Sequence, residues 1–498
     1  MEQKVTGLSY RILFLNTLAF TVCFAVWMFN GVLVTFLVDN QIFKWSSVQV
    51  GWLLAIPVLS GSIFRLHGGI WTDKYGGKWM LGGLLFLCAI PMFLVSQANS
   101  FVSFALCSLG FGLAGVGFSI GIASTSMWFS KEWQGRALGI FGMGNFGAGI
   151  TTLLAPTILK KITNNGANLD NWRQLPQIYA LALVIMGVIF IIFTKNKKSE
   201  FALNKKFTEM LKPLKEVRVW RFGLYYYLVF GCFVALAQWL VPYYMNVYSV
   251  SLVTAGLLAT IFSIPSGLIR ALGGFLSDKF GARRVMYWIF ITSIFFCFLL
   301  IIPKMTINSP GIGIQSKRNG TISFVSDSLI KVDDISYTLI KKPSEKQING
   351  KENSALPHKT EWQESIVKVG DKVKKKQIIA RGTTNIVFKA NIYVATLFIF
   401  LVGIIWGIGK AAVYKHIPNY FPNEVGAVGG MVGVLGGLGG FFSPIIFGYL
   451  LKWTGLWTSM WIFLWIISVI CLWWMHNIIT KMRDKAAPDT KGKFESIN

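Results

Sequence analysis

The chain has 498 residues, of which 54% are hydrophobic and only 14% charged, and its formal net charge is +27. Its six cysteines and four histidines show neither metal-ligand nor paired spacing, and no P-loop or nucleophile with a base is visible. These features exclude a recognisable enzyme, a metal site and a bound cofactor. They predict a membrane protein.

Long apolar runs such as LALVIMGVIFIIF and WTSMWIFLWIISVICLWW recur along the chain. Each run, with its flanks, reaches the roughly 20 residues that cross a hydrocarbon core, and spans of this length in lipid must be helices. The first run lacks the pattern of a cleavable signal peptide, so we expect it to stay in the mature protein. We predict an all-α polytopic fold with twelve spans, at about 11–37, 49–71, 79–97, 101–127, 135–159, 174–194, 222–247, 252–275, 283–303, 391–416, 424–451 and 455–477.

The positive charge gathers in loops. Residues 195–221 carry nine Lys/Arg against three Glu, which is the positive-inside bias expected of a cytoplasmic linker between spans six and seven. This bias predicts a multi-pass protein of the cytoplasmic membrane with both termini in the cytoplasm. Contact with anionic lipid explains the basicity better than nucleic acid does, and we expect a monomer. The predicted parts are a first bundle at 1–194, the linker, a second bundle at 222–303 and 391–480, an insertion at 304–390 and a tail at 481–498.

A sequence element is repeated in the two halves. IFRLHGGIWTDKYGGK at 63–78 returns as LIRALGGFLSDKFGAR at 268–283, and one offset of 205 residues relates Arg65 to Arg270 and the glycines and aspartates after them. The same element at the second span of each half indicates parallel repeats of six helices, as in major facilitator transporters. An alternative, purely structural interpretation is that the loop caps the helix and that its basic residues anchor it on the cytoplasmic side. We expect both roles, with the loop sealing and hinging the cytoplasmic side through Gly69, Asp73, Gly76, Gly274, Asp278 and Gly281.

The two arginines lie inside spans. Each precedes its loop aspartate by eight residues, which is about 12 Å along a helix, so both are predicted near the midplane. A charge there costs at least about 2.5–3.5 kcal/mol and is by default a functional-site hypothesis. None of the 21 acidic residues falls in a span interior. The arginines therefore favour a mobile anion; the alternative is that they snorkel or bond to carbonyl groups. Guanidinium suits flat oxyanions such as nitrate or carboxylate, and also phosphate.

Spans five and eleven are dense in glycine and each is closed by a proline: GIFGMGNFGAGITTLLAP at 139–156 and GGMVGVLGGLGGFFSPIIFG at 429–448. Such glycines allow close helix packing and easier bending. Packing alone explains most of them but not the amide Asn145. The predicted sliding positions are Gly142, Gly144, Gly147, Gly149, Gly436, Gly437, Gly439 and Gly440.

These paired segments resemble the signature segments of the nitrate/nitrite porter family, a branch of the major facilitator superfamily, and GIGKAAVYKHIP at 407–418 is also similar to it. The resemblance covers the transmembrane part and implies two bundles that rock around a central site for nitrate, nitrite or both. It implies that Arg65 and Arg270 clamp the anion and that Asn145 donates a hydrogen bond. It also implies that Tyr226 lies near the anion, with Tyr225 and Tyr227 as competing alignments, and that Phe118 packs over its face.

The coupling mode is ambiguous in the sequence. Proton-driven carriers commonly have a carboxylate in the membrane, and its absence favours exchange of nitrate for nitrite. Two residues keep proton symport open: His67, which titrates near neutral pH but is expected to face away from Arg65, and Lys410, since a desolvated lysine can lose its proton.

Residues 304–390 depart from the family. Their strand-like alternation and the VKVGDKV turn resemble half of a biotinyl/lipoyl-type hybrid barrel, and we expect a small β-domain outside the cytoplasm. A disordered basic loop is the alternative. No lysine hairpin for lipoylation or biotinylation is visible, and the partner of the insertion is unknown.

Two other functions compete with nitrate transport: a carrier of another small oxyanion or carboxylate, and a membrane sensor or scaffold that signals through the insertion. Repeated hinge loops and glycine-rich spans favour transport, because a receptor has no need of two-sided access.

Overall fold

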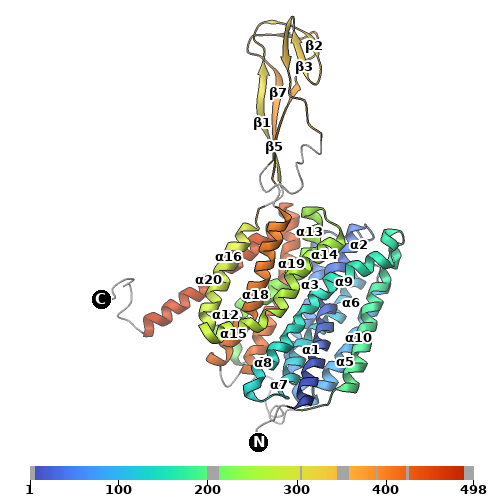
Figure 1. Ribbon diagram of the computed structural model, residues 1–498, viewed down its shortest axis with the longest axis vertical. Helices are drawn as coiled ribbons and strands as arrows, with labels where there is room; N and C mark the ends of the chain where they lie inside the picture. The colour runs from blue at the N-terminus through green and yellow to red at the C-terminus, as the bar shows by residue number, and fades with distance from the viewer. Residues whose placement is uncertain are drawn as a thin grey trace. The chain divides into compact units, whose positions relative to one another are not determined.

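The computed structural model describes residues 6–198, 212–302, 305–344, 358–388, 391–421 and 425–486. The chain forms two compact units: the helices, and a β unit within residues 302–395 that contains the predicted insertion. Figure 1 shows the helices in chain colours. We call the end of the helical unit at which α1 begins the inner end, which is the end expected to face the cytoplasm, and the opposite end the outer end.

The first half consists of ten α-helices joined partly by short 3-10 turns. Their bounds are α1 Gly7–Trp27, α2 Asn30–Asp39, α3 Ser47–Ile63, α4 Arg65–Tyr75, α5 Gly77–Leu94, α6 Phe101–Phe111, α7 Gly117–Ser126, α8 Lys131–Gly142, α9 Gly147–Ile162 and α10 Gln174–Phe193, with turns η1 Val95–Gln97, η2 Gly112–Val116, η3 Met143–Phe146, η4 Asn164–Gly166 and η5 Leu169–Arg173.

The second half repeats this pattern with fewer breaks. Its helices are α12 Val217–Tyr226, α13 Phe233–Tyr248, α14 Leu252–Leu268, α15 Arg270–Phe280, α16 Ala282–Leu299, α18 Ile392–Tyr420, α19 Val425–Thr454 and α20 Ser459–Ala486, with the short elements η7 Lys212–Lys215 and η8 Tyr227–Cys232, the latter a π-helix.

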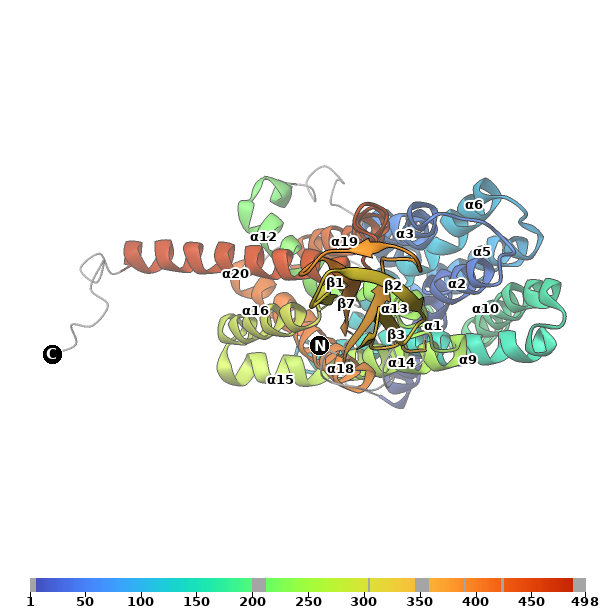
Figure 2. The same ribbon diagram turned by 90° about the horizontal axis from the view of Figure 1, so that it is seen from above.

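These elements form membrane spans as predicted. Among the described residues, ten helices are long and apolar enough to cross a membrane, and the number rises to twelve when each of two bent pairs counts as one span. Viewed from above, the blue-to-teal helices of the first half and the green-to-red helices of the second form two groups, with α3 beside α19 and α9 beside α14 at their boundary (Figure 2). The twelve-span, two-bundle prediction is confirmed.

Local sequence accounts for several helix ends. At the start of α3, the Ser46 side chain accepts a hydrogen bond from the Gln49 backbone N–H, and the Gln49 side chain accepts one from the Ser46 backbone N–H. Ser100 and Ser103 form the same capping box at the start of α6. At the inner end, α4 and α15 stop at Gly76 and Gly281, whose φ angles are +89° and +83°. A left-handed residue after a helix favours glycine, so the predicted cap role of these two glycines has a backbone reason.

Each bent span breaks immediately before its arginine. The bend is 40° between α3 and α4 and 46° between α14 and α15, so Arg65 and Arg270 begin the second segments. Gly61–Ser62 precedes the first break and Ser266–Gly267 the second, and Gly/Ser pairs are a recurrent cause of sharp kinks. The repeat thus extends to backbone shape, which the sequence motif alone did not predict.

The β unit has two antiparallel sheets. One has the strand order β1-β7-β5 and the other β4-β3-β2-β6. The bounds are β1 Met305–Gln315, β2 Gly320–Val325, β3 Leu329–Val332, β4 Ile335–Thr338, β5 His358–Ser365, β6 Lys372–Val373 and β7 Ile378–Phe388.

A small apolar core lies between these strands. It includes Ile322, Ile330, Val332 and Ile379, each no more than 1% exposed. The predicted VKVGDKV turn is present: Gly370 has φ +94° and the Lys368 amide donates to the Asp371 carboxylate at 2.7 Å. The alternative of a wholly disordered insertion is therefore wrong for the described part, whereas the likeness to a biotinyl/lipoyl barrel stays a prediction.

Candidate functional site

Arg65 is buried between the two halves, with only 2% of its surface exposed. Its Nε donates to the Gly115 carbonyl at 3.3 Å and its Nη1 to the Gly433 carbonyl at 3.2 Å. Nη2 is buried and has no hydrogen-bond partner among the described residues. Three aromatic rings surround the guanidinium, with centroids 5.0–5.4 Å from Cζ: Trp27, Phe118 and Phe230.

Arg270 enters the same space from the other half. It is 8% exposed, and its Nη1 is buried with no hydrogen-bond partner in the part of the chain that the structure describes. Its Cζ lies 5.3 Å from the centre of the Phe118 ring, so Phe118 contacts both guanidiniums. The two arginines repel each other electrostatically. The structure therefore places two cations beside one aromatic ring, each with a free donor.

Tyrosine side chains complete this site. Tyr226 is fully buried, stacks on Phe230 at a centroid distance of 4.9 Å and meets Tyr414 edge-on at 5.0 Å. Its hydroxyl is buried and interacts with that of Tyr414, which donates to the Gly429 carbonyl at 3.0 Å. Tyr226 and Tyr414 both interact electrostatically with Arg65. The centre of the Tyr414 ring lies 6.0 Å from Arg270 Cζ. Of the competing tyrosines, Tyr225 and Tyr227 face Phe290 and Ser443 instead.

Asn145 lies in η3, which links α8 to α9. It is fully buried, and no described residue forms a hydrogen bond with its amide nitrogen or its oxygen. A neighbouring residue, Gly142, contacts Arg270: a methyl group at this glycine would lie 3.2 Å from Nε. A buried amide without partners costs free energy, so the side chain is available to a ligand, although no direct contact with either arginine is observed.

The two candidate coupling residues lie in different environments. Lys410 is fully buried, donates to the Ser266 hydroxyl at 3.2 Å and sits 3.1 Å above the centre of the Phe233 ring. Arg270 and Lys410 repel each other electrostatically. His67, by contrast, packs near Phe64 and Trp71, two half-exposed side chains on the outer surface of the bundle. Only Lys410 is near the arginines.

No protein carboxylate neutralises these cations among the described residues. Four of the five ion pairs in that part of the chain lie in the β unit, and the fifth joins Lys415 to Asp278. Two buried guanidiniums with unused donors are the arrangement that a small anion would satisfy.

Residues 15–324 match the family description Major Facilitator Superfamily. The chain belongs to the major facilitator superfamily, in its nitrate/nitrite porter branch. A probable nitrate/nitrite antiporter, NarK1 of Thermus thermophilus, is 38% identical over 489 residues, 97% of this chain and 95% of that protein. A probable nitrate transporter, NarT of Staphylococcus haemolyticus, is 26% identical over 89% of both chains. The crystal structure of a bacterial homolog to the human lysosomal transporter Spinster shares the fold, with a TM-score of 0.62 at 13% identity over 95% of this chain and 97% of that one. The chain is a multi-pass membrane transporter and not an enzyme.

The loop motif of the transporter packs through only some of its glycines. A side chain at Gly69 or Gly274 would meet nothing within 4 Å, whereas their neighbours Gly68 and Gly273 pack tightly against Val116 and Ile408. The sealing and hinge roles of Gly69 and Gly274 stay predictions. The two aspartates of the motif differ from each other. Asp278 forms an ion pair with Lys415, whereas Asp73 has no ion pair among the described residues.

The glycine runs present two faces. Toward their own half, Gly144 and Gly147 pack on α1, while Gly436 and Gly439 pack on Tyr226 and Tyr227. Three of the other predicted sliding positions face the opposite half, and these are Gly142 on Arg270, Gly149 on Ile264 and Gly437 on Ser62. Gly440 packs both on Val234 of its own half and on Val58 of the other.

Contacts on the outer side of the arginines close the space between the halves. Gly51 of α3 faces the Pro444 carbonyl, and Gly256 of α14 faces the Thr152 carbonyl and the Pro156 ring. Thr152 and Thr260 share a hydrogen bond of 2.8 Å across the same boundary. Gly51 and Gly256 are related by the repeat offset that relates the two arginines. We call these contacts the outer seal.

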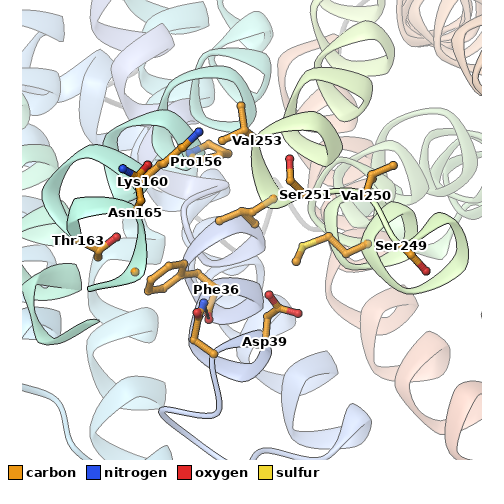
Figure 3. A pocket seen from close by; sticks show the side chains of 14 residues that line it. Phe36, Asp39, Pro156, Lys160, Thr163, Asn165, Ser249, Val250, Ser251 and Val253 are labelled. Carbon is orange, nitrogen blue, oxygen red and sulfur yellow. Dashed lines mark hydrogen bonds between the residues drawn. The ribbon is translucent and has the colours of Figure 1, made fainter. Parts of the chain in front are cut away.

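Beyond the outer seal lies an open pocket of about 500 Å³ (Figure 3). It is lined by both halves, with Phe36, Asp39 and Lys160 from the first half and the α13–α14 connection from the second. From η3 along α9 the order is Asn145, Thr152, Pro156 and Lys160, so the seal separates this outer pocket from the arginines.

Three residues of the site were missed by sequence reasoning: Trp27, Phe230 and Tyr414. The signal for Tyr414 was present, since it follows Lys410 by one helical turn in the family-like segment 407–418. Trp27 and Phe230 carry no such signal, because aromatic residues in apolar spans are usually packing residues.

Proposed function

We propose that the transporter carries nitrate, nitrite or both across the cytoplasmic membrane by alternating access, with the anion clamped between Arg65 and Arg270. The observation that carries this proposal is the pair of buried guanidiniums, one from each half, that flank Phe118 and retain unpartnered donors. The names of the Thermus and Staphylococcus relatives support the substrate. Orientation with both termini in the cytoplasm is part of this proposal.

The chemistry of the site suits a small planar anion. Forked guanidinium donors match flat oxyanions, the Phe118 ring offers a face for stacking, and the Tyr226 hydroxyl and Asn145 amide supply further donors. Alternating access follows from the placement of the clamp: an arginine from each half brings the halves together around the anion. The outer seal indicates that this structure is closed on its outer side.

A carrier of another small oxyanion or a carboxylate is the alternative substrate class. The aromatic rings around Arg65 leave little room for a carboxylate with a large substituent. A sensor or scaffold has less support, since the transporter fold and its repeat are complete.

Exchange of nitrate for nitrite is the proposed mode of coupling. Two unpaired arginines oppose closure of an empty site; two charges about 8 Å apart repel by about 2 kcal/mol at an effective dielectric of 20. A barrier of that size slows the return of the empty carrier roughly thirtyfold. A bound anion removes part of this repulsion, so the loaded carrier returns faster.

The test is reconstitution into liposomes with labelled nitrate outside. We expect nitrite inside the liposomes to accelerate nitrate entry more than an inward proton gradient does. Accumulation driven by a pH gradient alone in nitrite-free liposomes, and abolished in Lys410→Ala, would instead establish proton symport. His67→Ala is the matched control, because His67 is a titratable residue that packs beside Phe64 and Trp71.

The β unit is not part of the proposed transport path. Replacing roughly residues 306–388 by a short Gly/Ser linker should leave nitrate exchange measurable, because both arginines and all the spans except the first residues of α18 lie in the other compact unit. The assay is the same liposome exchange, with size-exclusion chromatography to show that the shortened protein is folded. A folded but inactive deletion protein would place the insertion in the mechanism.

A further inference from the structure

Three arginines gather at the inner end of the second half, away from the clamp. Arg218 and Arg221 lie in the first turns of α12, and Arg283 lies in the first turn of α16. They surround Tyr420 at the end of α18. Figures 1 and 2 show α12, α16 and α18 within the second bundle. We call these three residues the inner arginine cluster.

Aromatic contacts hold the cluster together. The Arg218 guanidinium lies 5.6 Å from the centre of the Tyr420 ring, and Arg283 Nη2 donates to the Tyr420 hydroxyl at 3.3 Å. Phe222 connects Arg221 to this ring: it lies 5.4 Å from the Arg221 guanidinium and 5.7 Å from Tyr420. Side chains from three helices thus converge on one place.

Arg221 is the unusual member. It is only 6% exposed, yet it makes no hydrogen bond and no ion pair with any residue in the described part of the chain. Arg221 and Arg283 both act electrostatically on His416, and Arg221 also acts on Tyr225. Asp278, which lies at the same end, is occupied by Lys415.

The level of the cluster matches the membrane interface. Arg221 is four residues from the start of α12, which is about 6 Å along the helix. Trp220 and Trp288, from α12 and α16, are 50% and 47% exposed, and exposed tryptophans of this kind mark the headgroup level of a bilayer. A ligand here would be at the depth of lipid phosphates.

We propose that the inner arginine cluster is a binding site for a phosphate group, and that its natural ligand is the headgroup of an anionic phospholipid in the inner leaflet. A phosphate accepts several charge-assisted hydrogen bonds at once, which matches three guanidiniums from two helices. It also supplies the negative charge that Arg221 lacks among the described residues. Free inorganic phosphate has the same chemistry and is the other source to be tested.

The test is thermal unfolding of the purified full-length transporter in detergent. Phosphatidylglycerol should raise the Tm by about 3 °C or more, as expected of a ligand that binds only the folded state, and phosphatidylcholine should not. Arg221→Gln and Arg283→Gln should each lose most of this shift. Arg284→Gln is the matched control: Arg284 is an exposed neighbour on the same helix, and its removal should leave the shift intact.

Each other outcome decides the proposal. An equal shift with inorganic phosphate alone, lost in Arg221→Gln, retains the phosphate site but makes the source soluble. The proposal is overturned if phosphatidylcholine raises the Tm as much as phosphatidylglycerol does. It is also overturned if both cluster variants keep the full Tm shift with phosphatidylglycerol. Arg283 is exposed, so Arg283→Gln keeps the test valid if Arg221→Gln does not fold.

Discussion

Replacing either clamp arginine by lysine should lower nitrate uptake roughly tenfold to hundredfold while membrane abundance stays near normal. Lysine keeps the charge but loses the planar fork, and a hydrogen bond to a charged group contributes about 1.5–3 kcal/mol. Arg65 also loses bonds to Gly115 and Gly433, which hold it between the halves. Uptake of labelled nitrate at several concentrations, in cells or liposomes, measures the effect.

Arg136→Lys is the matched control for this prediction. Arg136 is exposed on α8 beside Trp133, so the same change there should leave uptake within about twofold of the wild type, because surface substitutions of this kind cost little. Wild-type uptake by Arg65→Lys and Arg270→Lys together would show that a point charge suffices and that the forked clamp is wrong.

Much of the fold could be predicted because membranes impose strong rules. Span lengths follow from bilayer thickness and the two-bundle organisation from the repeat around Arg65 and Arg270. The location of those arginines in buried positions also followed from the cost of charge in lipid. The backbone breaks before them could not be predicted, since Gly61–Ser62 and Ser266–Gly267 occur in opposite order in the two halves and hide their equivalence.

The features that the sequence could not predict share a physical cause: sequence patterns do not specify which side of a helix meets a neighbour. Gly69 and Gly274 are motif positions, but Gly68 and Gly273 face the adjacent helices. Likewise, Trp27 and Phe230 resemble ordinary core aromatics until tertiary packing brings them against Arg65. Which of the many apolar side chains of a span lines the site depends on helix rotation.

Gly51→Ala and Gly256→Ala should each open the outer seal. A methyl group on Gly51 would lie 2.5 Å from the Pro444 carbonyl oxygen, and one on Gly256 would lie closer still to that of Thr152. Both obstacles are backbone atoms, which cannot rotate away. Overpacking typically costs about 1–3 kcal/mol. If that cost falls on the closed form alone, the ratio of closed to open transporter falls roughly five- to hundredfold, and nitrate uptake falls with it.

The opening can be measured separately from uptake. Ser62 lies between Gly51 and Arg65 along α3, is fully buried and faces Gly437 of the other half, so a Ser62→Cys reporter should react faster with a membrane-impermeant maleimide when Gly51 or Gly256 is replaced by alanine. The six native cysteines give little background, since five are buried and Cys107 is partly so. Gly83→Ala is the matched control because a methyl group there meets nothing within 4 Å.

The two seal glycines occupy equivalent positions in the repeat, so closure at the outer end requires both contacts. Each single substitution should therefore give most of the effect of the double one. Unchanged labelling and uptake in the double variant would mean that the halves do not move apart at these contacts during transport.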